Sequence, residues 1–74
     1  MTQYNGHRSW SAWNVAMWMT GDEGLYRWAD DLVRRYGATR AANIMARELD
    51  GQKTPDGAKY NRTCIREALR DWHQ

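Results

Sequence analysis

The thiol of Cys64 is the strongest nucleophile that the sequence offers, and it belongs to the only cysteine of the chain. We expect Cys64 in the first turn of the last helix, where the helix dipole could lower its pKa. A catalytic thiol also needs a base within hydrogen-bond distance. The two histidines, His7 and His73, stand near the chain ends and have no zinc-ligand spacing with Cys64. We therefore expect a small core residue at position 64, and no metal, no cofactor and no enzymatic activity.

Two pairs of adjacent carboxylates invite a general-acid role. They are Asp22-Glu23 and Asp30-Asp31. Asp22 is better explained as the N-cap of a helix whose first turn holds Glu23. The second pair stands four residues before arginines, and Arg27 stands four residues before Asp31, spacings that predict exposed ion pairs along one helix face. We expect structural roles for both pairs.

The remaining chemistry is cationic. Residues 1–33 carry two cations against four carboxylates, a net charge of −2, whereas residues 34–74 carry nine against five, a net charge of +4. An anionic partner would meet the second half. The candidate partner- or nucleic-acid-binding residues are Arg40, Arg47, Lys53, Lys59, Arg62, Arg66 and Arg70.

The last three of these arginines form a column at i, i+4 and i+8. Like charges at this spacing destabilise a helix unless an anion relieves them. An ordinary solvated face is the alternative interpretation, and the sequence leaves both open.

A tryptophan-rich helix is the element around which the others would be arranged. Trp10, Trp13, Met17 and Trp18 share one stripe of a helix that Ser9 caps and that ends near residue 19. Each indole can bury about 150–250 Å2. We therefore expect this stripe in the core, with an exposed ring as a binding platform being the less favoured interpretation.

Three further helices follow, and none of the chain shows β-alternation of useful length. The second covers residues 23–36 and ends at Gly37, the third covers about 40–49 with Thr39 as its cap, and the last follows a turn at Pro55 and the cap Asn61. The apolar faces predicted for them are Leu25, Trp28, Ala29, Leu32 and Tyr36; Ala41, Ala42, Met45 and Leu49; and Ile65, Ala68, Leu69 and Trp72. The small residues of the third face should let the tryptophan helix approach closely.

These patterns predict an all-α fold, a compact single-domain bundle of about four short helices over residues 1–74. The chain has no signal-peptide pattern and no apolar run of membrane-spanning length, and its single cysteine suits a reducing compartment. We expect the cytoplasm of a host cell and no membrane partner.

Two resemblances bear on function. Tyr4-Asn5-Gly6, Trp13-Asn14-Val15-Ala16 with Trp18, and Asp22-Glu23-Gly24-Leu25-Tyr26-Arg27 resemble a family of small uncharacterised phage and prophage proteins, which implies a mobile-element origin. Residues 54–69, TPDGAKYNRTCIREAL, are similar to a segment of the DNA-binding domain of large serine recombinases. That similarity implies nucleic-acid contact through Arg62, Arg66 and Arg70.

Two functions fit these observations. The favoured hypothesis is a non-enzymatic phage accessory protein that binds and inhibits a host nucleic-acid-directed defence component, an anti-CRISPR-like inhibitor. Its partner would be a host protein or ribonucleoprotein complex, and tryptophan and tyrosine would suit the interface. The alternative is a small helical DNA-binding regulator with DNA or RNA phosphate contacts. An aromatic ring that one copy cannot bury would also suit a homodimer.

Overall fold

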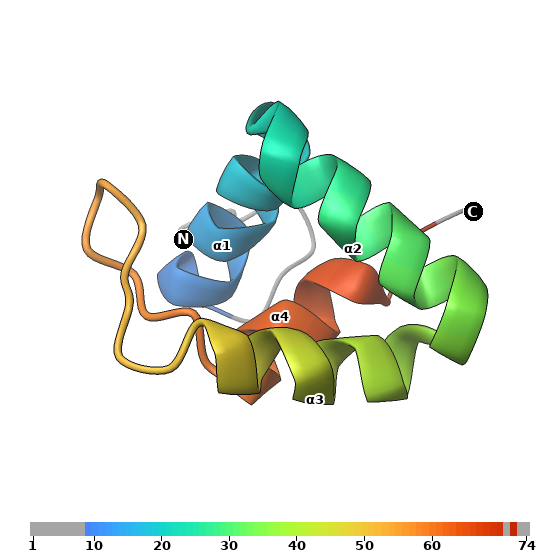
Figure 1. The fold of residues 1–74 in the computed structure, drawn as a ribbon. Coiled ribbons are helices and arrows are strands. Elements are labelled where there is room, and N and C mark those ends of the chain that lie inside the picture. The colour runs from blue at the N-terminus through green and yellow to red at the C-terminus, as the bar shows by residue number, and fades with distance from the viewer. Residues whose placement is uncertain (1–8, 71, 73–74) are drawn as a thin grey trace.

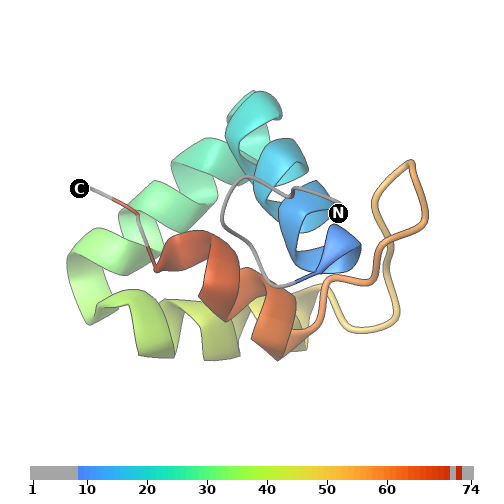
Figure 2. The same ribbon diagram turned by 180° about the vertical axis from the view of Figure 1, so that it is seen from behind.

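Four helices make up the architecture of the computed structural model, which describes residues 9–70 and 72. They are α1 (Trp10–Gly21), α2 (Glu23–Tyr36), α3 (Ala38–Glu48) and α4 (Arg62–Leu69). They pack in a ring in which α1 and α3 each contact both α2 and α4 (Figures 1 and 2). Within the described residues there is no strand, only a single β-bridge between Lys53 and Lys59. The predicted all-α bundle is therefore confirmed, and none of its described helices is long and apolar enough to cross a membrane.

Three helices begin at the side-chain caps that the sequence predicts. In each, the cap oxygen accepts a hydrogen bond of 2.8 to 3.2 Å from the backbone N–H three residues later. The caps are Ser9 for α1, Asp22 for α2 and Asn61 for α4. These bonds satisfy N–H groups that have no partner inside the helix, so they set where each helix starts.

The cap predicted for α3 is wrong. Helix α3 begins at Ala38 rather than Arg40, so Thr39 lies inside the helix and makes no capping bond. Gly37 ends α2 with its N–H bonded to Val33 O at 2.9 Å, and its own carbonyl accepts from Ala41 N at 2.9 Å. Its φ of 86° lets one residue end one helix and begin the next, a conformation that suits glycine.

The core face of α1 differs from the predicted tryptophan stripe. Helix α1 buries Ala12, Val15 and Met19, whereas Trp10 is 40% exposed and Met17 is 39% exposed. Trp13 and Trp18 are only partly buried. The side chains that α1 buries are smaller than indoles, so they fit between α1 and the helices α2 and α4 packed closely against it.

The other predicted core faces hold, with two corrections. Ala41, Ala42 and Met45 of α3 are buried as expected, and so are Ile65, Ala68 and Leu69 of α4. Tyr36 is 43% exposed instead of buried. Helix α3 uses its small residues to pack against α2 and α4 rather than against α1. The cations of α3 and α4 therefore lie outside the core. The error in the predicted core face of α1 does not change their position.

Ion pairs on α2 follow the predicted ladder except at one rung. Arg34 pairs with Asp30 at 2.9 Å, and Arg35 pairs with Asp31 at 3.0 Å. Arg27 pairs with Glu23 instead of Asp31, whose carboxylate already accepts from Arg35. These pairs are exposed, and each contributes little to stability.

Candidate functional site

The seven predicted cations come from three elements. Arg40 and Arg47 lie on α3, Lys53 and Lys59 lie on the loop between α3 and α4, and Arg62, Arg66 and Arg70 follow one side of α4. The structure brings most of them together, but not all. Arg40 lies at the far end of α3, where its guanidinium stands 5.3 Å from the centre of the Tyr36 ring. We place Arg40 outside the site because that cation–π contact occupies it.

A hydrogen bond joins Arg62 at the start of α4 to helix α3. The guanidinium Nε of Arg62 donates to Oδ1 of Asn43, which lies one helical turn before Arg47 on α3. Residues 43 and 47 share one face of the helix because they are four positions apart. Asn43 therefore fixes Arg62 on the side of α3 that also carries Arg47, while leaving the Arg62 charge unneutralised.

The column on α4 is partly neutralised at one end. Arg62, Arg66 and Arg70 line a shallow depression together with Thr63 and Glu67. Arg70 pairs with Glu67 at 3.2 Å, and the Glu67 side chain is only 10% exposed. In the part of the chain that the structure describes, no carboxylate forms an ion pair with Arg62 or Arg66. The charge available to a partner is thus greatest at the first two turns of α4.

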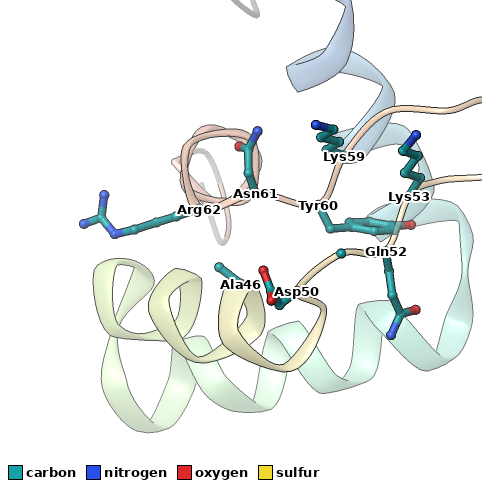
Figure 3. A pocket seen from close by; sticks show the side chains of 9 residues that line it. Ala46, Asp50, Gln52, Lys53, Lys59, Tyr60, Asn61 and Arg62 are labelled. Atoms are coloured by element: carbon teal, nitrogen blue, oxygen red, sulfur yellow. The ribbon is translucent and has the colours of Figure 1, made fainter.

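Lys53 and Lys59 are held side by side by the loop. Tyr60 N donates to Gln52 O at 3.2 Å, and Thr54 N donates to Ala58 O at 2.7 Å. These bonds flank the two lysines, which makes them a non-hydrogen-bonded antiparallel pair with Cα atoms about 4.5 Å apart. Figure 3 shows both side chains leaving the loop in the same direction. Like charges placed opposite one another in this way are destabilising.

The pocket beside these lysines is open rather than a closed anion cage. Its volume is about 320 Å3, and it is lined by residues of α3, of the loop and of the start of α4. Figure 3 shows the Asp50 carboxylate among the side chains that line it and the Arg62 guanidinium pointing away from the lysines. Because the cations diverge, they suit an extended anionic surface better than one small anion.

A polar network fastens this loop to α1. Asn14, which is 1% exposed, accepts from Thr54 Oγ1 at 2.6 Å and donates through Nδ2 to Asp56 Oδ2 at 2.9 Å. Trp18 Nε1 donates to the same Asp56 oxygen at 2.9 Å. Thr54 Oγ1 in turn accepts from Ala58 N at 3.0 Å. We call Asn14, Trp18, Thr54 and Asp56 the α1–loop clamp.

The clamp includes the turn that the sequence predicts and favours the ionised form of its carboxylate. Gly57 N donates to Thr54 O at 2.9 Å, so Pro55 and Asp56 occupy the centre of a β-turn. Hydrogen bonds from Asn14 and then Trp18 lower the pKa of Asp56 below its ordinary value because both favour the ionised carboxylate.

Sequence reasoning missed the four clamp residues and Asn43 as parts of this site. The only local signal was the spacing of Asn14 and Trp18, which places an amide and an indole N–H on the same side of α1. Their partner Asp56 stands 42 and 38 residues further along. A pairing over that distance cannot be deduced from helical periodicity.

The residues considered for catalysis are buried in the core, cap a helix or form ion pairs. Cys64 is buried, and burial raises its pKa, contrary to the lowering that the helix dipole suggested. Asp22 is a cap, and Asp30 and Asp31 are bonded to arginines. Among residues 9–70 and 72, no three His, Cys, Asp or Glu side chains lie close enough to hold a metal ion. His7 and His73 lie outside the described residues.

Comparison with known proteins places the chain in a family. Neither the curated proteins nor the solved structures contain a match to it. A family model described as a family of unknown function, DUF7249, matches residues 1–71, which include the clamp and every cation of the site. The chain therefore belongs to the DUF7249 family.

Proposed function

We propose that this protein is a non-enzymatic accessory protein of phage or prophage origin that binds and inhibits a host nucleic-acid-directed defence component. The binding surface is Arg47, Lys53, Lys59, Arg62, Arg66 and Arg70, which we call the basic face. The observation that carries this proposal is the clustering of cations at the junction of α3, the loop and α4, where Lys53, Lys59 and Arg62 form no ion pair within the described residues. The mobile-element origin rests on the resemblance of the first half to phage and prophage proteins.

Four of these six charges are placed where they oppose folding. Lys53 faces Lys59 across a bridge, and Arg62 precedes Arg66 by one helical turn. Both arrangements place like charges next to each other and destabilise the folded chain. On α2, in contrast, each arginine is placed to meet a carboxylate. Local rules of this kind are broken mainly where a functional surface requires it.

A basic face restricts which part of a defence complex it can meet. Proteins that handle nucleic acid present cationic channels, and such channels repel another cationic surface. The complementary surfaces are an acidic protein patch or the nucleic acid that the complex carries. We therefore expect the basic face to bind one of these two acidic surfaces and not to occupy the cationic channel as a mimic of nucleic acid.

Capture from host lysate, followed by an activity assay, tests this function. The tagged protein should retain a nucleic-acid-directed complex, and adding the purified protein should lower the nuclease or targeting activity of that complex. Substituting Arg62 and Arg66 with alanine removes two charges and should abolish both effects. The matched control, R34A/R35A, also removes two charges, but from the opposite-charge ladder on α2, and should behave as the wild type. Equal loss in both variants, or capture without inhibition, contradicts the proposal.

The second candidate, a DNA-binding regulator, is favoured by the arginine column on α4. Arg62 and Arg70 are eight residues apart, which corresponds to about 12 Å along the helix axis. One strand of duplex DNA presents a phosphate about every 3.4 Å along its axis, so this span covers about 3.5 phosphate spacings. A regulator must also prefer one sequence. Binding of the operator region of its own genome in preference to random duplex would support it over the inhibitor.

A further inference from the structure

The loop between α3 and α4 holds its cations in a defined arrangement, which makes it more selective than a general positive charge would be. We propose that Lys53, Lys59 and Arg62 form a preorganised site for the phosphodiester backbone of a nucleic acid, and that the α1–loop clamp holds this site in its binding geometry. This inference deepens the proposed function and rests on the basic face being the binding surface.

The geometry of the two lysines favours phosphates. Their side chains leave one face of the bridge in the same direction, from Cα atoms about 4.5 Å apart. Lysine ammonium groups bind phosphate oxygens as compact point charges and need no planar partner. Neither lysine forms an ion pair within the described part of the chain. A backbone that passes over the bridge would neutralise both charges and relieve their mutual repulsion.

Arg62 extends the contact toward α4. It lines the same pocket as the lysines but points to the other side of it, and Asn43 holds its guanidinium through Nε. The two terminal nitrogens of the guanidinium stay available because Nε makes the bond to Asn43. The three cations are thus spread over the loop and the start of α4 and do not converge on one point. Such a spread suits a strand of phosphates better than a single carboxylate.

The clamp explains why the lysines stay in place without a partner. Thr54 lies next to Lys53, and its hydroxyl both donates to buried Asn14 and accepts from Ala58 N, beside Lys59. Asp56, at the tip of the turn, is bonded to two side chains of α1. The loop therefore pays little further entropy when it binds, which is the benefit of preorganisation. Asn14 and Trp18 are positioning residues, because they act on the contact through the loop.

Fluorescence anisotropy with labelled 20-base-pair duplex DNA of random sequence, titrated over a series of salt concentrations, tests the proposal. We expect wild-type affinity to fall with salt. The K53A/K59A variant should bind more weakly, with a slope of log K against log salt smaller by about 1.8, since each phosphate contact contributes about 0.9. The R34A/R35A variant has the same net charge as K53A/K59A and should keep the wild-type slope. Equal slopes in K53A/K59A and the wild type would overturn the lysine contact.

The clamp is tested separately with Trp18→Phe, which removes one hydrogen bond to Asp56 and leaves the net charge unchanged. Measured at a temperature where the variant is fully folded by circular dichroism, it should bind duplex more weakly with an unchanged salt slope. An unchanged affinity would overturn the positioning role. The melting temperature of K53A/K59A should equal or exceed that of the wild type, because the substitutions remove the repulsion between the two lysines. Weaker DNA binding by this variant therefore cannot be attributed to unfolding.

Two further probes separate this inference from the proposed function. Single-stranded DNA and duplex RNA of the same length identify which backbone is preferred, and binding of any one of the three probes supports phosphate recognition. If none binds, while the protein still captures and inhibits a host complex from nuclease-treated lysate, the phosphate site is wrong and the proposed function stands. If nucleic acid binds but no host complex is inhibited, the phosphate site stands and the proposed inhibitory function is wrong.

Discussion

Replacement of Asn14 with alanine tests whether the α1–loop clamp stabilises the fold. The side chain is 1% exposed, and its amide makes two hydrogen bonds to the loop. Alanine leaves the Thr54 hydroxyl, itself 4% exposed at the residue level, without its acceptor. A buried hydroxyl whose proton has no acceptor costs about 1–3 kcal/mol, even though its oxygen still accepts from Ala58 N, and the lost bond to the exposed Asp56 carboxylate adds little.

The expected loss is therefore about 1–3 kcal/mol in the free energy of unfolding. A chain of this length has a total stability of roughly 4–11 kcal/mol, so the loss is a large fraction of it. A loss of about 2 kcal/mol lowers the melting temperature by roughly 8–16 °C for a domain of this size. Urea denaturation and thermal melting, both followed by helical circular dichroism, measure the two quantities.

A double-mutant cycle with Thr54→Val assigns the loss to the clamp. Valine removes the hydroxyl, so Asn14→Ala should cost about 1–2 kcal/mol less in the valine background than in the wild type. The control Asn43→Ala also removes a hydrogen bond between elements, but an exposed one, and should cost less than about 0.5 kcal/mol. A cost below about 0.5 kcal/mol for Asn14→Ala, or additive effects in the cycle, would refute the reasoning.

Three other predictions follow from burial and charge. Met19→Ala should destabilise the chain by about 2–5 kcal/mol in urea denaturation, whereas Trp10→Ala should cost less than about 1 kcal/mol. A larger cost for Trp10→Ala than for Met19→Ala would instead support a core built on the tryptophans. Cys64 should react slowly with a disulfide reagent at pH 7 and quickly once the chain is denatured in urea, because burial raises its pKa; a rapid reaction of the folded chain would contradict this. The pKa of Asp56 is lower in the folded chain than in the unfolded one. The ionised carboxylate therefore contributes its full stabilisation when the pH is above the ordinary pKa near 3.8. That stabilisation is lost as the pH falls through the pKa of the folded chain. Thermal melts between pH 6 and pH 2 should therefore show a smaller loss of stability for Asp56→Asn than for the wild type, and parallel curves would refute it.

Local interactions account for what the sequence predicted correctly. The caps Ser9, Asp22 and Asn61 bond to groups three residues away, and the turn at Pro55 closes within four residues. The cationic column on α4 follows from helical spacing alone. The third cap failed because Gly37, through its positive φ, already begins α3 before Thr39 is reached.

The core face of α1 could not be read from periodicity because apolar residues surround this helix on nearly every side. The stripe of Ala12, Val15 and Met19 is as helical as the stripe of tryptophans. Size favoured the indoles as core residues, since larger side chains bury more area. Close packing in the ring of helices favoured the small residues, and that constraint exists only once α2 and α4 are in place.

By itself, the sequence determined the helical class, most helix boundaries, the faces that α3 and α4 bury and the cationic character of the second half. Each of these depends on residues within about one or two helical turns. Only the tertiary structure decided that Asn14 and Trp18 hold the loop, that Lys53 faces Lys59, and that Arg62 meets Asn43 while Arg40 does not join the site. Those pairings join residues on different elements, and chain folding brings them together through packing that no local pattern encodes.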